Sequence, residues 1–484
     1  MGITVVGLGP GNGRLLTREA WEVLTSAGTV YFRTKRHPAV DDLPVSITRE
    51  SFDHLYDSAD TFEEVYSQIV QELLAMGADA DIVYAVPGHP FVAESTVTRL
   101  VKAAKEANVS IRIVEGLSFV EPSLTALSVD ALNGLQLFDA IELAAYQYPP
   151  LNADVPVLLA QVYSRRVAGE LKLGLTAVYP DEHPVTLIHA AGFDQQKVEQ
   201  IPLYAIDRSP HIDHLTSLYI PPLPQPSDLQ ALAETVGVLR APGGCPWDQE
   251  QTSQSLRNGF LEEASEVLDA IDNDDPVNLC EELGDMLYHI VMQVQIAQEG
   301  GDFTLADVIG GIDRKLKFRH PHVWGDVDVA DSDEVVKNWE ELKKVEKGKL
   351  PSDSLLNGIP IALPALARSQ KVQDRVRKVG FDWPSIDGVY GKLQEEILEV
   401  QEAITPAEKL DELGDVLFVA VNLASWLGVD AESALRGATQ KFSRRFQKIE
   451  ELLTKRGEKI EGLDIAVLEE AWQEIKRELA EEDV

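Results

Sequence analysis

An internal repeat in the C-terminal half constrains the fold of this chain more than any other feature. EEASEVLDAI (262–271) matches EEILEVQEAI (395–404), and CEELGDML (280–287) matches LDELGDVL (410–417). Two spaced pairs also recur: Lys315 and Arg319 as Lys441 and Arg445, and Trp339 and Lys343 as Trp472 and Lys476. The offsets are 133, 130, 126 and 133 residues, always in the same order. We interpret this half as a tandem duplication of a helical unit.

The rest of the chain predicts a different architecture. At 484 residues the whole chain is too long for one core. Short β-rich runs such as ITVVGLG and ADIVYAVPG alternate with helical patterns in the first 222 residues, which indicates an α/β region. The Pro-rich segment 220–228 predicts a linker, and Pro351, Ser352 and Asp353 a second break. The expected domains are therefore residues 1–222 (α/β), 223–350 (all-α) and 351–484 (all-α).

Each helical unit contains the pattern E-E-x-x-E followed by E-L-G-D. Carboxylates three residues apart share a helix face, and turn formers between the two segments allow the helices to run antiparallel. Converging carboxylates repel one another unless a multivalent cation lies between them, and oxygen ligands favour Mg²⁺ or Mn²⁺. The predicted metal ligands are Glu263, Glu266, Glu282 and Asp285 in the first unit, and Glu396, Glu399, Glu412 and Asp415 in the second.

The repeated basic and aromatic pairs suit a phosphate-containing substrate. Lys441 and Arg445 lie four residues apart on one helix face, as do Trp472 and Lys476. Basic side chains at this spacing can bind phosphate oxygens, and an indole can stack on a base. Taken singly, these residues would more simply be surface cations and a core tryptophan; their repetition favours a binding role.

The helical half resembles the MazG family in these motifs and in GGCPWD (243–248), RKLKFRHPHVWGD (314–326), VGFDW (379–383) and KFSRRF (441–446). The resemblance implies an all-α fold, Mg²⁺-dependent hydrolysis of nucleoside triphosphates to monophosphate and pyrophosphate, and association into homodimers or higher oligomers. It implies catalytic roles for the second unit's acidic set. Any one of these carboxylates could also accept the proton of the attacking water, with Glu395 as the spare candidate. The resemblance also implies that Lys392, Lys441, Arg445, Trp472 and Lys476 contact the nucleotide.

The first unit departs from this pattern at one position. Gly259 stands three residues before the first glutamate pair, where the second unit has Lys392. The hypothesis that follows is that the second unit carries most of the turnover.

The α/β block resembles the tetrapyrrole (corrin/porphyrin) methylase family in GLGPGNGRLLT (7–17), YAVPGHPFVAEST (84–96) and VEGLSFVEPSLTAL (114–127). The resemblance implies two α/β subdomains with S-adenosylmethionine in the cleft between them, near Gly9, Pro10, Gly11, Gly88 and His89. The family's usual G-D-P is Gly88-His89-Pro90 here, which changes the charge beside the expected cofactor site. The two modules together are similar to YabN-type bacterial proteins.

Composition limits the partners of this chain. Lys and Arg number 43 against 80 Asp and Glu, a net charge of −37, which disfavours nucleic acid and anionic membranes as partners. Two cysteines are too few for a disulfide scaffold, and the N-terminus lacks a signal-peptide pattern. The sequence thus predicts a cytoplasmic protein. Two alternatives to the hydrolase stay open: a methyltransferase whose helical half is a dimerisation or regulatory module, and a non-enzymatic nucleotide sensor.

Overall fold

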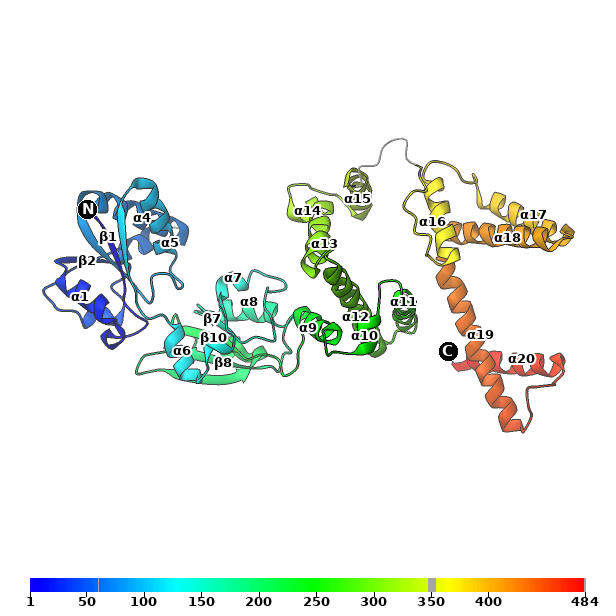
Figure 1. Cartoon of the computed structure of the whole chain (residues 1–484), viewed down its shortest axis with the longest axis horizontal. Helices are drawn as coiled ribbons and strands as arrows, with labels where there is room; N and C mark the ends of the chain where they lie inside the picture. Colours follow the sequence, from blue (N-terminus) through cyan, green and yellow to red (C-terminus); the bar gives the residue numbers. More distant parts are fainter. Residues whose placement is uncertain (60, 347–353, 483–484) are drawn as a thin grey trace. The chain divides into compact units, whose positions relative to one another are not determined.

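The computed structural model describes residues 1–59, 61–346 and 354–482. The chain divides into two compact units, Met1–Gln251 and Thr252–Val484. The first is α/β and the second is all-helical, as the sequence predicts (Figure 1).

The first half of the α/β unit is built on a parallel sheet of order β3-β2-β4-β1-β5. Its strands are β1 (Gly2–Gly7), β2 (Thr29–Phe32), β3 (Thr48–Ser51), β4 (Asp81–Val86) and β5 (Ser110–Val114). The connecting helices are α1 (Arg18–Ser26), α2 (Pro38–Asp41), α3 (Asp53–Ser58), α4 (Phe62–Asp79) and α5 (Ser95–Ala107). Apolar side chains of β1 and β4 are buried on both faces of this sheet, which is why these strands read as continuous apolar runs.

The second half contains a mixed sheet of order β6-β7-β10-β8-β9, in which only β6 and β7 pair in parallel. Its strands are β6 (Gln136–Asp139), β7 (Val157–Ala160), β8 (Pro184–His189), β9 (Lys197–Pro202) and β10 (Thr216–Ile220). Its helices are α6 (Val120–Leu127), α7 (Ala140–Leu143) and α8 (Arg165–Leu175). The unit therefore has two subdomains, each with its own sheet.

Residue Ile220 of the Pro-rich segment ends β10, and residues 221–228 contain no helix or strand. At its C-terminal end, the backbone N–H groups of Ser227 and Asp228 donate to the Asp154 carboxylate at 2.8 and 3.1 Å. The chain then continues into α9 (Leu229–Arg240) and α10 (Pro246–Glu250), which belong to the first compact unit. The boundaries at 222/223 and 350/351 stay predictions; the second, with residues 351–353, lies outside the described residues.

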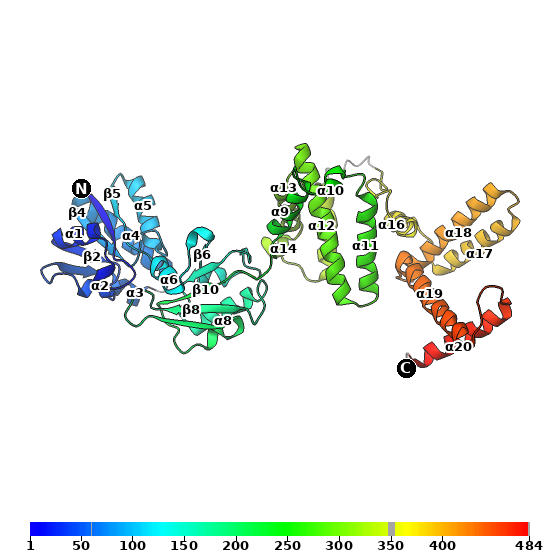
Figure 2. The same cartoon turned by 60° about the horizontal axis from the view of Figure 1, so that its bottom comes forward.

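The helical unit shows the duplication as two helix hairpins (Figure 2). One pairs α11 (Arg257–Asp272) with α12 (Pro276–Gly300), and the other pairs α17 (Ile386–Glu402) with α18 (Pro406–Trp426). A proline stands at the first turn of both α12 and α18, where no backbone N–H is needed. The other helices are α13 (Leu305–Arg319), α14 (Pro321–Trp324), α15 (Ser332–Glu346), α16 (Ala365–Arg377), α19 (Ala431–Arg456) and α20 (Ile465–Glu482).

Within the described ranges, none of the individual helices has both the length and the apolar composition to cross a membrane. The consecutive helices α18 and α19, bent by 103°, meet that criterion only when taken together.

Candidate metal centre and cofactor loops

Three carboxylates of the second helical unit converge between α17 and α18. Glu396 and Glu399 lie one turn apart on α17, and Glu412 comes from α18. One oxygen from each lies within 4.8 Å of the others. Glu396 is only 3% exposed, and its Oε2 has no hydrogen-bond partner among the residues that the structure describes. Because a buried carboxylate oxygen without a donor is costly, this arrangement fits a bound cation.

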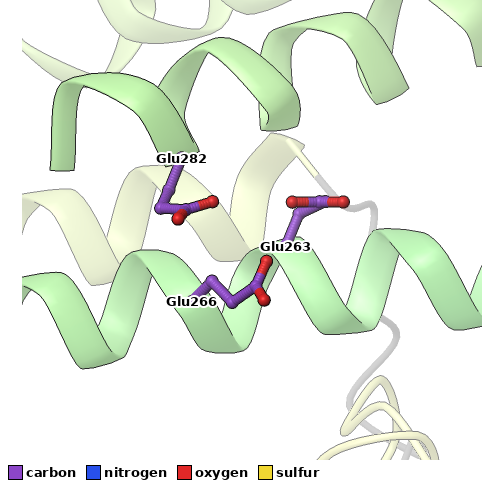
Figure 3. Close-up of side chains that lie close together, drawn as sticks. All are labelled: Glu263, Glu266 and Glu282. Carbon is purple, nitrogen blue, oxygen red and sulfur yellow. The ribbon is translucent and has the colours of Figure 1, made fainter. Parts of the chain in front are cut away.

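The first unit repeats this arrangement. Glu263 and Glu266 on α11 and Glu282 on α12 direct their carboxylates into the space between the two helices (Figure 3). One oxygen of each again lies within 4.8 Å of the others. The sequence repeat has therefore preserved a three-carboxylate geometry in both hairpins.

The aspartates predicted as fourth ligands lie outside these two groups of oxygens. Asp285 follows Glu282 by one turn of α12, and Asp415 follows Glu412 by one turn of α18. Asp285 is close enough for its charge to raise the pKa of Glu263 and Glu282. The assignment of both aspartates as ligands stays a prediction.

The excess negative charge helps to raise the pKa of three of these carboxyl groups. Burial, with the charges of Glu266 and Asp285, raises the pKa of both Glu263 and Glu282. In the second unit, a hydrogen bond with Glu396, followed by burial and the Glu396 charge, raises the pKa of Glu399. An all-oxygen donor set with unbalanced negative charge fits Mg²⁺ or Mn²⁺ and not zinc.

A lysine already offsets part of this charge in the second unit. Lys392 Nζ lies 2.8 Å from Glu395 Oε1 and 2.6 Å from Glu396 Oε1, and these contacts raise its pKa. Lys392 thus lies at the edge of the carboxylate group. Glu395 itself is exposed and lies outside the converging oxygens.

In the first unit, which has Gly259 at the position of this lysine, a histidine of the facing helix lies over the glycine. A Cβ at Gly259 would lie 2.9 Å from the imidazole Cε1 of His289, so the missing side chain makes room for the ring. His289 Nε2 lies 3.7 Å from Glu263 Oε1. The counterpart of His289 in α18 is Val419, so two positions have changed together. The sequence pattern identifies Gly259 as a departure from the second unit, whereas nothing in that pattern points to His289.

The basic and aromatic residues of the second unit meet between α19 and α20. The Arg445 guanidinium lies over the Trp472 ring at 5.6 Å, and Phe442 lies 5.2 Å from the same ring. Trp472 also packs against the apolar core of this helix pair. Its alternative interpretation as a core tryptophan therefore holds in part. Arg445 Nε is buried and has no partner in the described part of the chain. Lys441 and Lys476 are exposed.

The equivalent arginine of the first unit, Arg319, already has a carboxylate partner. Arg319 lies over Trp339 at 5.6 Å, but its Nε also donates to Glu346 Oε2 at 2.8 Å. Glu346 corresponds to Leu479 in the second unit, and this exchange was not noticed in the sequence. Arg445 therefore lacks the carboxylate that holds Arg319.

The glycine loops of the α/β unit lie together at the ends of β1 and β4. Gly9 and Gly88 form an isolated bridge with hydrogen bonds of 3.2 and 2.9 Å, and both have positive φ. A Cβ on Gly11 would lie 3.0 Å from the carbonyl oxygen of Gly192 in the second subdomain. His89 Nδ1 accepts from the Phe91 N–H at 3.0 Å, and Pro10 is partly buried. The predicted cofactor residues are thus brought to one place, and their role stays a prediction.

Gly7 and Gly116, which are not among the predicted cofactor residues, pack closely against the backbone of Gly88. A Cβ on Gly7 would lie 2.6 Å from the Gly88 carbonyl oxygen and 2.7 Å from the Gly116 nitrogen. We expect Gly7→Ala to lower the stability of the α/β unit by about 1–3 kcal/mol, because backbone atoms on both sides must move. Differential scanning calorimetry of the full chain checks this. Gly28→Ala is the control, since no atom lies within 4 Å of a Cβ there; equal shifts for both variants would contradict the expectation.

His37 connects the chain after β2 to the first glycine loop. Its Nδ1 accepts from the Ala39 N–H at 3.3 Å, and the ring also hydrogen bonds to the Gly9 backbone. Burial, with a smaller effect of the Arg33 charge, lowers the pKa of His37 to about 4 despite the Gly9 bond. The folded protein therefore holds this imidazole neutral.

This pKa predicts acid sensitivity of the α/β unit. Because the folded pKa lies below the unfolded value of 6.5, stability is full above pH 6.5 and falls as the pH drops toward 4. The loss at pH 4 should reach about 2–3 kcal/mol. Calorimetry across this range tests it, and His37→Gln should flatten the pH dependence. An unchanged slope in that variant would show that other groups are responsible.

The sequence repeat, sheets and site geometry define the class of this protein: a tetrapyrrole-methylase-like domain joined to MazG-type helical units. The profile of the "Tetrapyrrole (Corrin/Porphyrin) Methylases" matches residues 2–207, and that of the "MazG nucleotide pyrophosphohydrolase domain" matches residues 251–324 and 388–449. The chain is 38% identical over 483 residues to "Uncharacterized protein YabN" of Bacillus subtilis, covering 98% of each chain. It belongs to the YabN family.

The helical half also has relatives of its own. It is 45% identical over 246 residues to a nucleoside triphosphate pyrophosphohydrolase of Escherichia coli K12, covering 50% of this chain and 94% of that protein. It is 44% identical over 247 residues to the nucleoside triphosphate pyrophosphohydrolase/pyrophosphatase MazG of Thermotoga maritima, covering 51% and 95%. Both alignments have the length of the whole helical half.

Proposed function

We propose that this chain is a Mg²⁺-dependent nucleoside triphosphate pyrophosphohydrolase that releases a monophosphate and pyrophosphate. The observation that carries the proposal is the three-carboxylate group of the second unit with the adjacent Lys392. One buried oxygen of Glu396 has no hydrogen-bond partner within the described part of the chain. Relatives named as such hydrolases support it.

The carboxylates Glu396, Glu399 and Glu412 would hold the ion, with Asp415 as the predicted fourth ligand. When bound, the ion would offset the charge of the phosphates and of the leaving pyrophosphate. Lys392 would leave the glutamates and bind a phosphate oxygen, and the freed Glu395 carboxylate could accept a proton from the attacking water. Lys441, Arg445 and Lys476 would bind phosphates, and Trp472 would stack on the base.

The second unit would carry most of the hydrolysis. The first unit keeps the three carboxylates but has Gly259 in place of Lys392, and its Arg319 is paired with Glu346. Of the proposed phosphate-binding residues, the first unit therefore lacks the lysine, and its arginine is already paired with a carboxylate. A bound ion alone does not position a triphosphate for in-line attack.

A second copy of the chain would complete the site and cover an apolar surface. Leu283 and Leu287 on α12 are 47% and 46% exposed, and their counterparts Leu413 and Leu417 on α18 are each 51% exposed. Such rows, one helical turn apart, are typical of a helix that packs in a four-helix core. Figures 1 and 2 show the α17–α18 pair at one end of α19 and α20 near the other, so a partner could supply nucleotide contacts across this gap.

S-adenosylmethionine is the ligand we propose for the glycine loops of the α/β unit. The positive-φ glycines Gly9 and Gly88 bring backbone N–H and C=O groups close to the end of the sheet, with no side chain in the way. Isothermal titration calorimetry with S-adenosylmethionine tests this. Loss of binding in Gly9→Val, with the fold intact, is the expected result, and no binding by the wild-type chain would remove the methyltransferase alternative.

The hydrolase proposal is tested by product analysis of the full chain. Incubation with ATP, GTP or dUTP and Mg²⁺ should give monophosphate and pyrophosphate, and chelation should stop the reaction. Diphosphate plus phosphate, or no reaction by a folded and Mg²⁺-loaded chain, would overturn the proposal. Broad tolerance of the base is expected, since stacking on an indole discriminates weakly.

A further inference from the structure

A pocket of about 590 Å³ lies between the segment before α17 and the C-terminal end of α18. Two indoles, a guanidinium, a carboxylate and a hydroxyl line it, contributed by Trp383, Trp426, Arg377, Asp382 and Ser425. The volume lies within the range of small-molecule sites, about 300–1,000 Å³. The proposed hydrolysis uses none of these side chains.

Asp382 fixes the walls of this pocket. Its Oδ1 accepts from the Trp383 backbone N–H at 2.8 Å and from Trp426 Nε1 at 3.3 Å, and its Oδ2 accepts from Arg377 Nε at 2.7 Å. Although burial opposes it, these bonds keep the pKa of Asp382 below its ordinary value. The Trp383 ring packs on α17, where a Cβ at Gly388 would lie 2.9 Å from it. The indoles are therefore held in place, and Trp383 is still 46% exposed.

Two polar groups in the pocket lack partners. Arg377 Nη2 and Ser425 Oγ are both buried, and neither has a hydrogen-bond partner among residues 1–59, 61–346 and 354–482. The Arg377 guanidinium also lies over the Trp426 ring at 6.0 Å. Buried donors without acceptors are costly, and a ligand with acceptor atoms at its edge would remove this cost.

An adjoining pocket of about 450 Å³ shares Ser425 and shows what else the ligand would carry. Asp374 and Asp430 line it together with Lys371. Two carboxylates against one ammonium disfavour a phosphate and suit hydroxyl groups, which can donate to both. A planar base with acceptor atoms would suit the pocket lined by the two indoles, and an uncharged ribose joined to it would suit the adjoining pocket.

We propose that these pockets form a purine nucleoside site, separate from the metal centre. The base stacks on Trp383 and Trp426 and accepts from Arg377, and the ribose lies beside Ser425. Trp426 follows Asp415 by eleven residues of α18, which places it roughly 16 Å along the helix from the carboxylates. In the first unit the counterpart of Trp426 is Ile296, so the second unit alone has this indole pair.

Calorimetric titration of the full chain with guanosine and adenosine, in EDTA, tests the site. Chelation silences the metal-dependent site, so this result does not depend on whether the chain hydrolyses triphosphates. Saturable binding is expected, weakened about 5- to 150-fold in Trp426→Ile, because stacking contributes about 1–3 kcal/mol per base. Trp247→Phe, at the corresponding tryptophan of GGCPWD, is the matched control and should bind as the wild type does.

Arg377→Lys is the second variant, because it keeps the charge while losing the planar fork that reaches the base. It should weaken guanosine binding at least 5-fold, with an unchanged circular dichroism spectrum. Absent binding by the wild type, as a second copy covering Trp383 would cause, overturns the proposal. Equal affinities in wild type, Trp426→Ile and Arg377→Lys also overturn it, as does tighter binding of GMP than of guanosine.

Discussion

Glu396→Gln should lower kcat/KM for triphosphate hydrolysis by about 1,000-fold or more. The substitution keeps the shape of the side chain but removes the charge of the most buried carboxylate in the second unit's group. A divalent ion contributes several kcal/mol to phosphoryl chemistry, and each 1.4 kcal/mol is a factor of ten. Steady-state kinetics with pyrophosphate detection measures the effect, and Mn²⁺ titration followed by electron paramagnetic resonance should show that one class of site is lost.

Glu263→Gln is the matched control for this prediction. It removes the equivalent carboxylate from the first unit, where Lys392 has no counterpart and Arg319 is paired with Glu346. We expect a change of less than about 3-fold in kcat/KM, together with loss of a different class of Mn²⁺ site. If Glu263→Gln abolished hydrolysis while Glu396→Gln did not, the division of labour between the units would be the reverse of the one proposed.

Arg445→Ala should lower kcat/KM by about 100- to 1,000-fold. Its guanidinium lies over Trp472, and its buried Nε has no hydrogen-bond partner among the residues that the structure describes, so it is available to a phosphate. Removing one charge-assisted donor from a phosphoryl or oxyanion site has effects of this size. A decrease mainly in kcat would place the contact in the transition state, and a rise mainly in KM would place it in substrate binding.

Arg319→Ala in the first unit is expected to act differently. It leaves Glu346 without its cation and removes a buried guanidinium from Trp339, so we expect lower thermal stability with nearly unchanged hydrolysis. Equal losses of activity in Arg319→Ala and Arg445→Ala would show that both units bind the substrate phosphates.

The sequence predicted the features that depend on short-range pattern. The apolar runs ITVVGLG and ADIVYAVPG became β1 and β4, and the repeated acidic segments became the hairpins α11–α12 and α17–α18. The convergence of Glu396, Glu399 and Glu412 also followed, because helical spacing and a short turn leave few other arrangements. The fourth ligands and the domain boundaries stay predictions.

Features that depend on contacts between distant elements were not predicted. His289 reaches the space above Gly259 from the facing helix, and Glu346 reaches Arg319 from α15. Nothing in either local pattern identifies these partners, since side-chain register between helices is set by packing. Comparing the units position by position gives one usable signal: His289 aligns with Val419, and Glu346 with Leu479.

The exchange of Gly259 and His289 for Lys392 and Val419 makes the divergence of the two units hard to reverse. A lysine introduced at position 259 alone would collide with the imidazole, since even its Cβ would lie 2.9 Å from the ring. Replacing His289 alone would leave Glu263 without the imidazole that lies 3.7 Å from it and without a lysine at position 259. A return to the second unit's arrangement that begins at position 259 therefore passes through an overpacked intermediate, and this single step is disfavoured. The two positions are therefore coupled, and an exchange between the two halves of the repeat is favoured only when both residues change together.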